Sequence, residues 1–78
     1  MRRKYLVLGA GMMGRAVAFD LVKSHGTGCL AVVDSNSKAC ASLEKWLGIE
    51  VHSLDAKDRA IDRLIQDSES VIVALPYG

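Results

Sequence analysis

The stretch Tyr5-Leu-Val-Leu-Gly-Ala-Gly-Met-Met-Gly14 decides how this chain folds. A short apolar run breaks into three glycines and passes directly into a helical pattern, which is the layout of a strand, a tight phosphate-binding turn and a helix N-terminus. We expect Gly9 to bend the backbone off the strand, Gly11 to leave room for a pyrophosphate beside the main chain, and Gly14 to let the helix sit close to the strand. The ligand's negative charge would then meet unpaired N–H groups at the positive end of the helix dipole.

An acidic residue at the end of the next apolar run supports a dinucleotide as the ligand. Residues 30–33 form a second apolar run, and this run is followed by Asp34. Dinucleotide-binding units place a ribose-binding acid about 20 residues after the last glycine, which is where this carboxylate lies. A carboxylate accepts both hydroxyls of the adenosine ribose and repels a phosphate on its 2′ position. The sequence therefore predicts NAD as the cofactor, with NADP less favoured.

The glycine spacing also fits the P-loop of nucleoside triphosphatases. That loop requires Lys and then Ser or Thr after its last glycine, where this chain has Arg15 and Ala16. A P-loop is therefore excluded.

The composition is that of a small core-forming soluble segment: 78 residues, 50% apolar and 24% charged. A net charge of +1 gives no electrostatic footprint for nucleic acid, and no apolar run approaches the roughly 20 residues of a membrane span. Cys29 and Cys40 lack metal-ligand spacing, so we expect free thiols, no metal site and a cytoplasmic location.

The chain alternates strand-like and helix-like segments with short connections. We predict helices at residues 12–23, 38–47 and 56–67, and further strands at residues 29–33, 49–54 and 70–75. This is an α/β pattern, and it predicts a partial Rossmann fold: a parallel sheet in the order 3-2-1-4 with helices on both faces. In the last helix we expect the buried stripe Ala60, Ile61, Leu64 and Ile65.

Asp55 follows the third predicted strand and has two interpretations. It can cap the helix that we expect next, or it can edge the adenine together with Leu54, because the carboxyl ends of parallel strands line the ligand crevice. Capping is the preferred interpretation.

These residues resemble the N-terminal NAD(P)-binding region of the saccharopine dehydrogenase family, and within it the lysine dehydrogenase branch. The likeness rests on residues 6–21, 33–34, 54–55 and 71–76 and spans essentially the whole chain. It implies that Asp34 holds the adenosine ribose. It implies that the pyrophosphate is cradled by Gly9, Gly11, Met12, Met13 and Gly14. It also implies that Leu75 and Pro76 approach the central portion of the cofactor. Relatives that use NADP tend to carry Ser-Arg in place of Asp34-Ser35, which supports NAD.

The resemblance implies oxidation of an amino-acid carbon–nitrogen bond, with hydride transfer to the nicotinamide. No residue here is a credible catalytic group, because the lysines and histidines are better explained as solvated or structural. We expect residues 1–78 to be the first part of a Rossmann domain, inactive without the remaining strands and a substrate domain that would bind the small-molecule substrate. Assembly into a homo-oligomer stays open. The alternative function is a nucleotide-sensing regulatory module without catalysis, of the potassium-uptake type.

Overall fold

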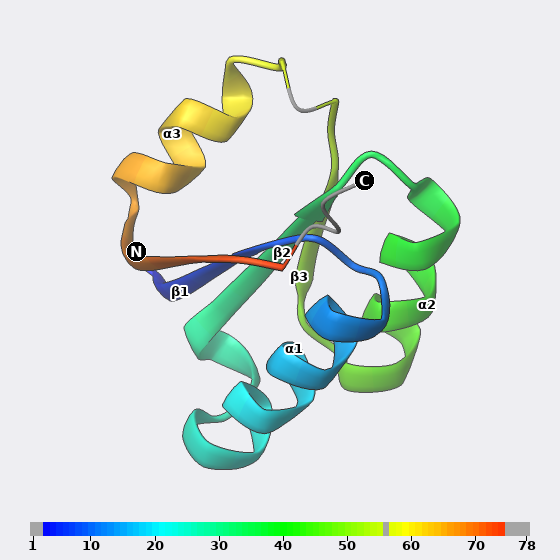
Figure 1. Cartoon of the computed structure of the whole chain (residues 1–78). Coiled ribbons are helices and arrows are strands. Elements are labelled where there is room, and N and C mark those ends of the chain that lie inside the picture. The colour runs from blue at the N-terminus through cyan, green and yellow to red at the C-terminus, as the bar shows by residue number, and fades with distance from the viewer. Residues whose placement is uncertain (1–2, 56, 75–78) are drawn as a thin grey trace.

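Four parallel strands form one sheet within the part of the chain that the computed structural model describes, residues 3–55 and 57–74. They are β1 (Arg3–Leu8), β2 (Leu30–Asp34), β3 (Glu50–Ser53) and β4 (Ser68–Val73). Their order across the sheet is β3-β2-β1-β4, as Figure 1 shows. The predicted strand order is therefore confirmed.

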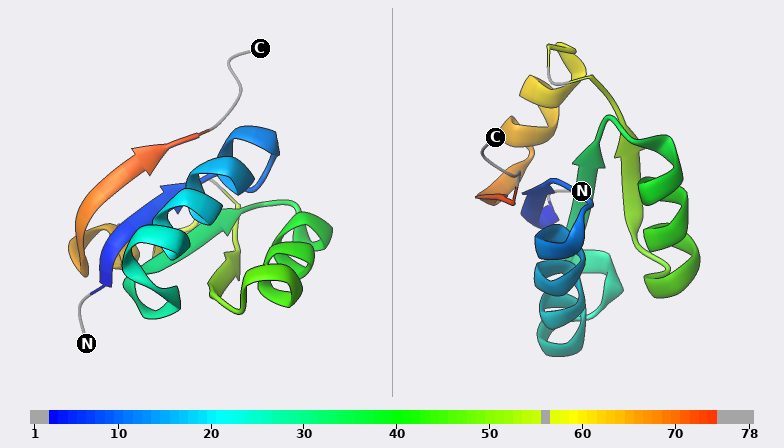
Figure 2. Two further views of the ribbon diagram at one scale, coloured as in Figure 1. Left: turned by 90° about the horizontal axis from the view of Figure 1, so that it is seen from below. Right: turned by 45° about the vertical axis from the view of Figure 1, so that its right-hand side comes forward.

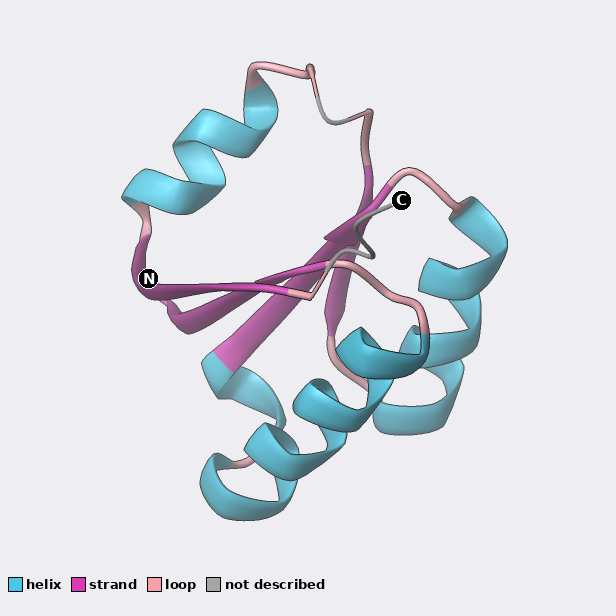
Figure 3. Cartoon of the chain, in the orientation of Figure 1, coloured by secondary structure: helices cyan, strands magenta, loops and turns pink. Residues whose placement is uncertain are grey.

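Helices cover both faces of this sheet, as the sequence predicted. Helices α1 (Met12–His25) and α2 (Ser37–Leu47) lie on one face, and α3 (Ala60–Gln66) lies on the other (Figure 2). A short 3-10 turn, η1 (Thr27–Cys29), leads from α1 into β2. Figure 3 shows that a helix lies between each strand and the next along the chain. Helical crossovers of this kind are the usual connections between parallel strands.

The central strands are buried on both sides because their side chains alternate between two cores. Val7 and Val32 face α1 and α2, and Leu6 and Ala31 face α3; all four side chains are 0% exposed. The core beneath α1 and α2 consists of Val7, Ala10, Ala18, Leu30, Val32, Cys40, Leu43, Ile49 and Ala74. The core beneath α3 consists of Leu6, Ala31, Val33 and Leu64. The core beneath α3 is the smaller of the two.

The register brings the carboxyl ends of the strands to one edge of the sheet. Leu8 lies beside Val33 and Val73, and Asp34 lies beside Ser53. The glycine-rich turn and the β2–α2 connection both leave the sheet at this edge. Strand pairing thus places the glycine-rich turn and Asp34 at the same edge of the sheet.

The connection between β3 and α3 differs from the prediction. We predicted a helix over residues 56–67, whereas α3 begins at Ala60. Asp55 does not cap it: its Oδ1 accepts from the Lys57 N–H at 2.9 Å, and its carbonyl accepts from the Asp58 N–H at 2.9 Å. The helix start is instead supported by Asp58, whose Oδ1 accepts from the Ala60 N–H at 2.9 Å. Asp55 thus closes a turn, and Asp58, three residues later, bonds the first N–H of the helix.

The buried face of α3 is narrower than predicted. Leu64 is buried and Ile61 is half-buried, but Ala60 and Ile65 are exposed, so the predicted four-residue stripe is wrong at two positions. The helix ends at Gln66, and the Ser68 hydroxyl donates to the Leu64 carbonyl at 2.7 Å. Strand β4 starts at Ser68, two residues before the predicted start at Ser70.

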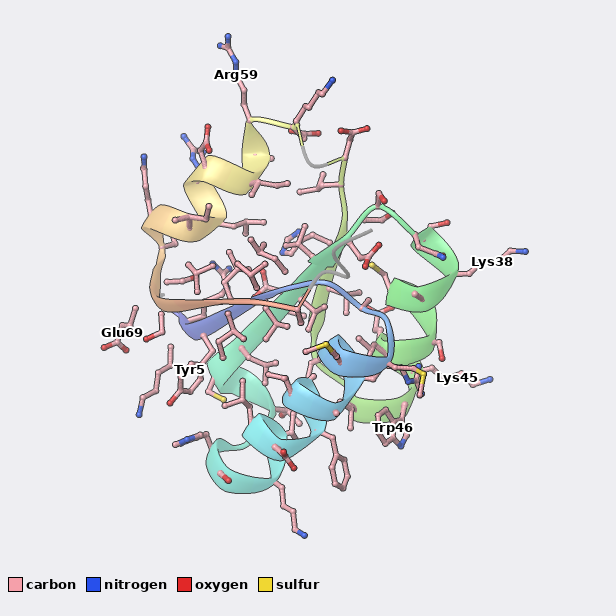
Figure 4. The ribbon with its side chains drawn as sticks, in the orientation of Figure 1. Tyr5, Lys38, Lys45, Trp46, Arg59 and Glu69 are labelled. Atoms are coloured by element: carbon pink, nitrogen blue, oxygen red, sulfur yellow. The ribbon has the colours of Figure 1, made fainter. Side chains whose placement is uncertain are left out.

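On the outer side of α1 and α2, two aromatic side chains stack in parallel. The rings of Phe19 and Trp46 lie 5.5 Å apart at an interplanar angle of 3°, and the Arg15 guanidinium lies 4.9 Å from the Trp46 ring. Figure 4 shows Trp46 at the surface of α2. The cluster joins the two helices at their exposed sides, where aromatic stacking and cation–π contacts add to burial.

Candidate cofactor site

The turn between β1 and α1 requires glycine at two positions for reasons internal to the chain. Gly9 has a φ of +124°, which side-chain-bearing residues rarely adopt. At Gly14, a Cβ would lie 1.9 Å from the Gly9 carbonyl oxygen, so no side chain fits between the helix and the turn. The Gly9 N–H donates to the Val33 carbonyl at 2.7 Å and ties the turn to β2. The turn is thus packed tightly beneath the start of α1.

Gly11 differs from these two glycines. Its φ is −76° and its ψ is −162°, an ordinary extended conformation, and a Cβ built there meets nothing within 4 Å. The folded chain would therefore accept a larger residue at this position. Open space beside exposed main chain is what a diphosphate requires in order to approach the backbone.

The N-terminus of α1 faces this open space without a cap. Gly11 supplies no side-chain hydrogen bond, the first turn holds no acidic residue, and the first bond within the helix runs from the Arg15 N–H to the Gly11 carbonyl at 2.8 Å. Met12 and Met13 follow Gly11 and are 90% and 65% exposed. Backbone N–H groups at a helix start point outward along the axis, so this end offers donors to an anion.

Asp34 lies directly beside the glycine turn. Its Oδ2 accepts from the Ala10 N–H at 2.7 Å, and its Oδ1 accepts from the Asn36 N–H at 2.8 Å. The carboxylate is partly buried. The structure therefore brings together the acid and the turn that the sequence predicted to form one site. The contact from Ala10 was not predicted, because a main-chain donor leaves no signal in the identity of its residue.

The remaining candidates lie at the same edge with less direct contact to the turn. Ser35 is exposed, and its carbonyl accepts from the Ser53 hydroxyl at 3.5 Å. Asp55 is exposed, and Leu54 is half-buried, with its N–H donating to the Asp34 carbonyl at 3.0 Å. The main chain after β3 thus runs beside Asp34. The two predicted contacts at residues 75 and 76, Leu75 and Pro76, lie outside the described residues.

Three basic side chains of α1 and α2 are directed away from the glycine turn. The Arg15 guanidinium donates to the Ser42 hydroxyl at 3.1 Å and stacks on Trp46. Lys38 and Lys45 extend outward from α2, away from the sheet (Figure 4). Binding of an anion at the turn would thus rest on main-chain amides and the helix dipole, as the sequence predicted.

Beneath Asp34 lies a thiol that supports the backbone. The Cys40 Sγ donates to the carbonyls of Asp34 and His52 at 3.6 Å each. Burial raises the pKa of the Cys40 thiol. The hydrogen bond to the Asp34 backbone lowers this pKa and the Asp34 charge raises it, and the net effect is upward, so the thiol stays protonated at neutral pH.

In the described residues no three His, Cys, Asp or Glu side chains gather as metal ligands. Over the same residues, no helix has the length and apolar character needed to cross a membrane.

The parallel β3-β2-β1-β4 sheet, the glycine turn at its carboxyl edge and the acid that ends β2 define the nucleotide-binding half of a Rossmann fold. The family model described as "Saccharopine dehydrogenase NADP binding domain" matches residues 5–78. The chain belongs to this family, which confirms the predicted resemblance at the level of the family and indicates a nucleotide-binding domain of the oxidoreductase type. A search of curated proteins finds no match to the chain. The family's name gives NADP as the nucleotide, and it does not support the predicted preference for NAD.

Proposed function

We propose that this chain binds a nicotinamide dinucleotide at the glycine turn, as the cofactor-binding part of an oxidoreductase acting on an amino-acid carbon–nitrogen bond. The observation that carries the proposal is Gly11. The folded chain gives no internal reason for glycine there, yet the residue begins an uncapped helix next to open space. A diphosphate placed there supplies the missing reason, since it needs both the space and the free N–H groups.

Asp34 supports NAD as the preferred form of this dinucleotide. The carboxylate is fixed by two main-chain donors beside the turn, where the ribose next to a bound diphosphate would lie. Two ribose hydroxyls can donate to its remaining lone pairs. A 2′-phosphate at that point would be repelled by the carboxylate. For two unit charges about 4 Å apart, the repulsion energy is about 1 kcal/mol in water and about 4 kcal/mol at the lower dielectric of a protein surface. The family's name favours NADP, so the comparison of the two affinities is the deciding measurement.

The residues of this chain bind and orient the cofactor in this proposal, while hydride chemistry belongs to the nicotinamide. Gly11, Met12, Met13 and Gly14 surround the diphosphate, and Asp34 holds the ribose. We propose a cytoplasmic oxidoreductase that takes a small-molecule amino acid, with proton transfer carried out by residues outside this chain. The chain alone is then expected to bind the cofactor without oxidising lysine or other amino acids.

The test is calorimetric titration of the full chain with NAD and with NADP, repeated on Gly11→Val. We expect NAD to bind at least tenfold more tightly than NADP, and Gly11→Val to weaken NAD binding at least tenfold by filling the space beside the main chain. Gly28→Val is the matched control. Gly28 also meets nothing within 4 Å and lies in η1, remote in sequence from the turn, so its substitution should leave affinity unchanged.

Two results would contradict the proposal in different parts. Equal loss of NAD affinity in Gly11→Val and Gly28→Val would remove the glycine turn as the binding site. Tighter binding of NADP than of NAD by the unaltered chain would leave the site in place and overturn the assignment of NAD. Circular dichroism of each variant shows whether the fold is retained.

A further inference from the structure

We infer that Asp34 positions the glycine turn for the diphosphate, in addition to any contact it makes with the ribose. This inference rests on the proposed function and deepens it: the acid that ends β2 shapes the part of the site that receives the phosphate groups.

The hydrogen bonds of Asp34 join three segments. Oδ2 accepts from the Ala10 N–H at 2.7 Å in the β1–α1 turn, and Oδ1 accepts from the Asn36 N–H at 2.8 Å in the β2–α2 turn. The carboxylate itself ends β2. One side chain therefore connects the glycine turn, the sheet and the start of α2.

The contact to Ala10 completes the fixing of the turn. The Gly9 N–H is already held by the Val33 carbonyl at 2.7 Å, so two consecutive amides of the turn are pinned to β2. Ala10 is 1% exposed, and its N–H would otherwise be a buried donor without a partner. Gly11, the next residue, is exposed and begins the helix. Fixing residues 9 and 10 thereby sets where the free amides of α1 point.

The charge of Asp34 allows its role in positioning the glycine turn to be separated from its contact with the ribose. A carboxylate close to a diphosphate repels it, so an acid that only contacted the ribose would weaken the binding of any ligand that lacks ribose hydroxyls. A positioning acid has the opposite effect on the same ligand, because a fixed turn loses less conformational freedom on binding. A ligand with the diphosphate and without the hydroxyls therefore separates the two roles.

The experiment compares ADP with 2′,3′-dideoxy-ADP as ligands of the full chain and of Asp34→Ala and Asp34→Asn. We expect Asp34→Ala to lower the affinity for dideoxy-ADP about fivefold, even though a repulsive charge has been removed. Asp34→Asn keeps the size and one acceptor oxygen, so its loss should be smaller. Asp20→Asn is the matched control: it removes the same charge from an exposed position in α1 and should leave both affinities unchanged.

If Asp34→Ala bound dideoxy-ADP as tightly as the unaltered chain, or more tightly, while losing affinity for ADP, the inference would be overturned and Asp34 would be a ribose contact only. Amide hydrogen exchange at Ala10 provides a measurement that needs no ligand. We expect exchange there to be at least tenfold faster in Asp34→Ala. An unchanged rate would also overturn the inference. If the unaltered chain bound neither nucleotide, the proposed function would fail, and the exchange rate alone would decide whether Asp34 holds the turn.

Discussion

Two helices of this molecule begin at the same edge of the same sheet, and their first turns are built in opposite ways. At α2, the Asn36 Oδ1 accepts from the N–H groups of Lys38 and Ala39 at 3.0 and 3.1 Å. At α1, Gly11 supplies no such oxygen, and the two residues that follow are largely exposed. One helix start is satisfied by its own chain, and the other is left with donors to offer.

The difference between the two helix starts shows that equivalent places in the fold can serve either the stability of the chain or the binding of a ligand. A capping side chain typically stabilises a helix by about 1 kcal/mol relative to alanine. The chain has this stabilisation at α2 and lacks it at α1, where an anion can satisfy the same donors. We interpret the missing cap at α1, next to the open space at Gly11, as a feature of the proposed cofactor site.

The largest effect is expected from Gly14→Ala. The new Cβ would lie 1.9 Å from the Gly9 carbonyl oxygen, which belongs to backbone that cannot rotate aside. We expect a loss of about 3 kcal/mol or more in the free energy of unfolding, measured by urea denaturation. Gly28→Ala is the control, because nothing lies within 4 Å of its Cβ. Similar losses in the two variants would show that α1 does not press on the turn as described.

Gly11→Asn copies the cap of α2 onto α1. The backbone at Gly11 is extended, as a capping residue requires, and the space for a side chain is open. We expect unfolding stability to rise by a few tenths of a kcal/mol and NAD affinity to fall about tenfold, because the new oxygen occupies the donors. Urea denaturation and calorimetry on the same samples measure both. A loss of stability together with an unchanged affinity would break the contrast between the two helices.

The sequence was sufficient to predict the order of the strands and to place the glycine turn at the same edge of the sheet as Asp34. Residues 5–14 carry the glycines that a tight strand-to-helix turn requires, Asp34 ends the neighbouring strand, and strand pairing brings the two together. Helix α3 was less predictable, because Asp55 and Asp58 are both suitable capping residues and the choice between them depends on how far the turn must reach before Leu64 meets the sheet. The contact from the Ala10 N–H could not be predicted from side-chain identities.

Asn36→Ala tests the other side of the comparison. It removes the acceptor for Lys38 and Ala39 and leaves the Asn36 N–H, which donates to Asp34 through the backbone. We expect a loss of about 1 kcal/mol in the free energy of unfolding, with NAD affinity unchanged within twofold. Ser37→Ala, at the exposed position that follows the cap, is the control and should change neither quantity appreciably. A large loss of affinity in Asn36→Ala would mean that the start of α2 also receives the ligand.

The smallest effect lies at the opposite end of the sheet, where a pH-dependent cluster should leave the site untouched. Glu50 begins β3 and accepts from Arg3, with 2.8 Å between Nη2 and Oε2, and it is hydrogen bonded to His52. Partial burial acts to raise the pKa of the Glu50 carboxyl, but the hydrogen bonds from His52 and Arg3 outweigh it and hold the pKa below its ordinary 4.5. Because the folded-state pKa is the lower one, the ionised carboxyl stabilises the fold above about pH 4.5, and this stabilisation is lost as the pH falls through the folded-state value.

Glu50→Gln should therefore lower the unfolding free energy at pH 7 by only a few tenths of a kcal/mol, since the side chain is 42% exposed and the ion pair is screened. The difference between the variant and the unaltered chain should shrink as the pH is lowered from 5 to 3 in urea denaturation. NAD affinity at pH 7 should be the same in both. If the NAD affinity of Glu50→Gln fell together with its stability, the two ends of the sheet would be coupled. The contrast between the starts of α1 and α2 would then depend also on the strands that join them.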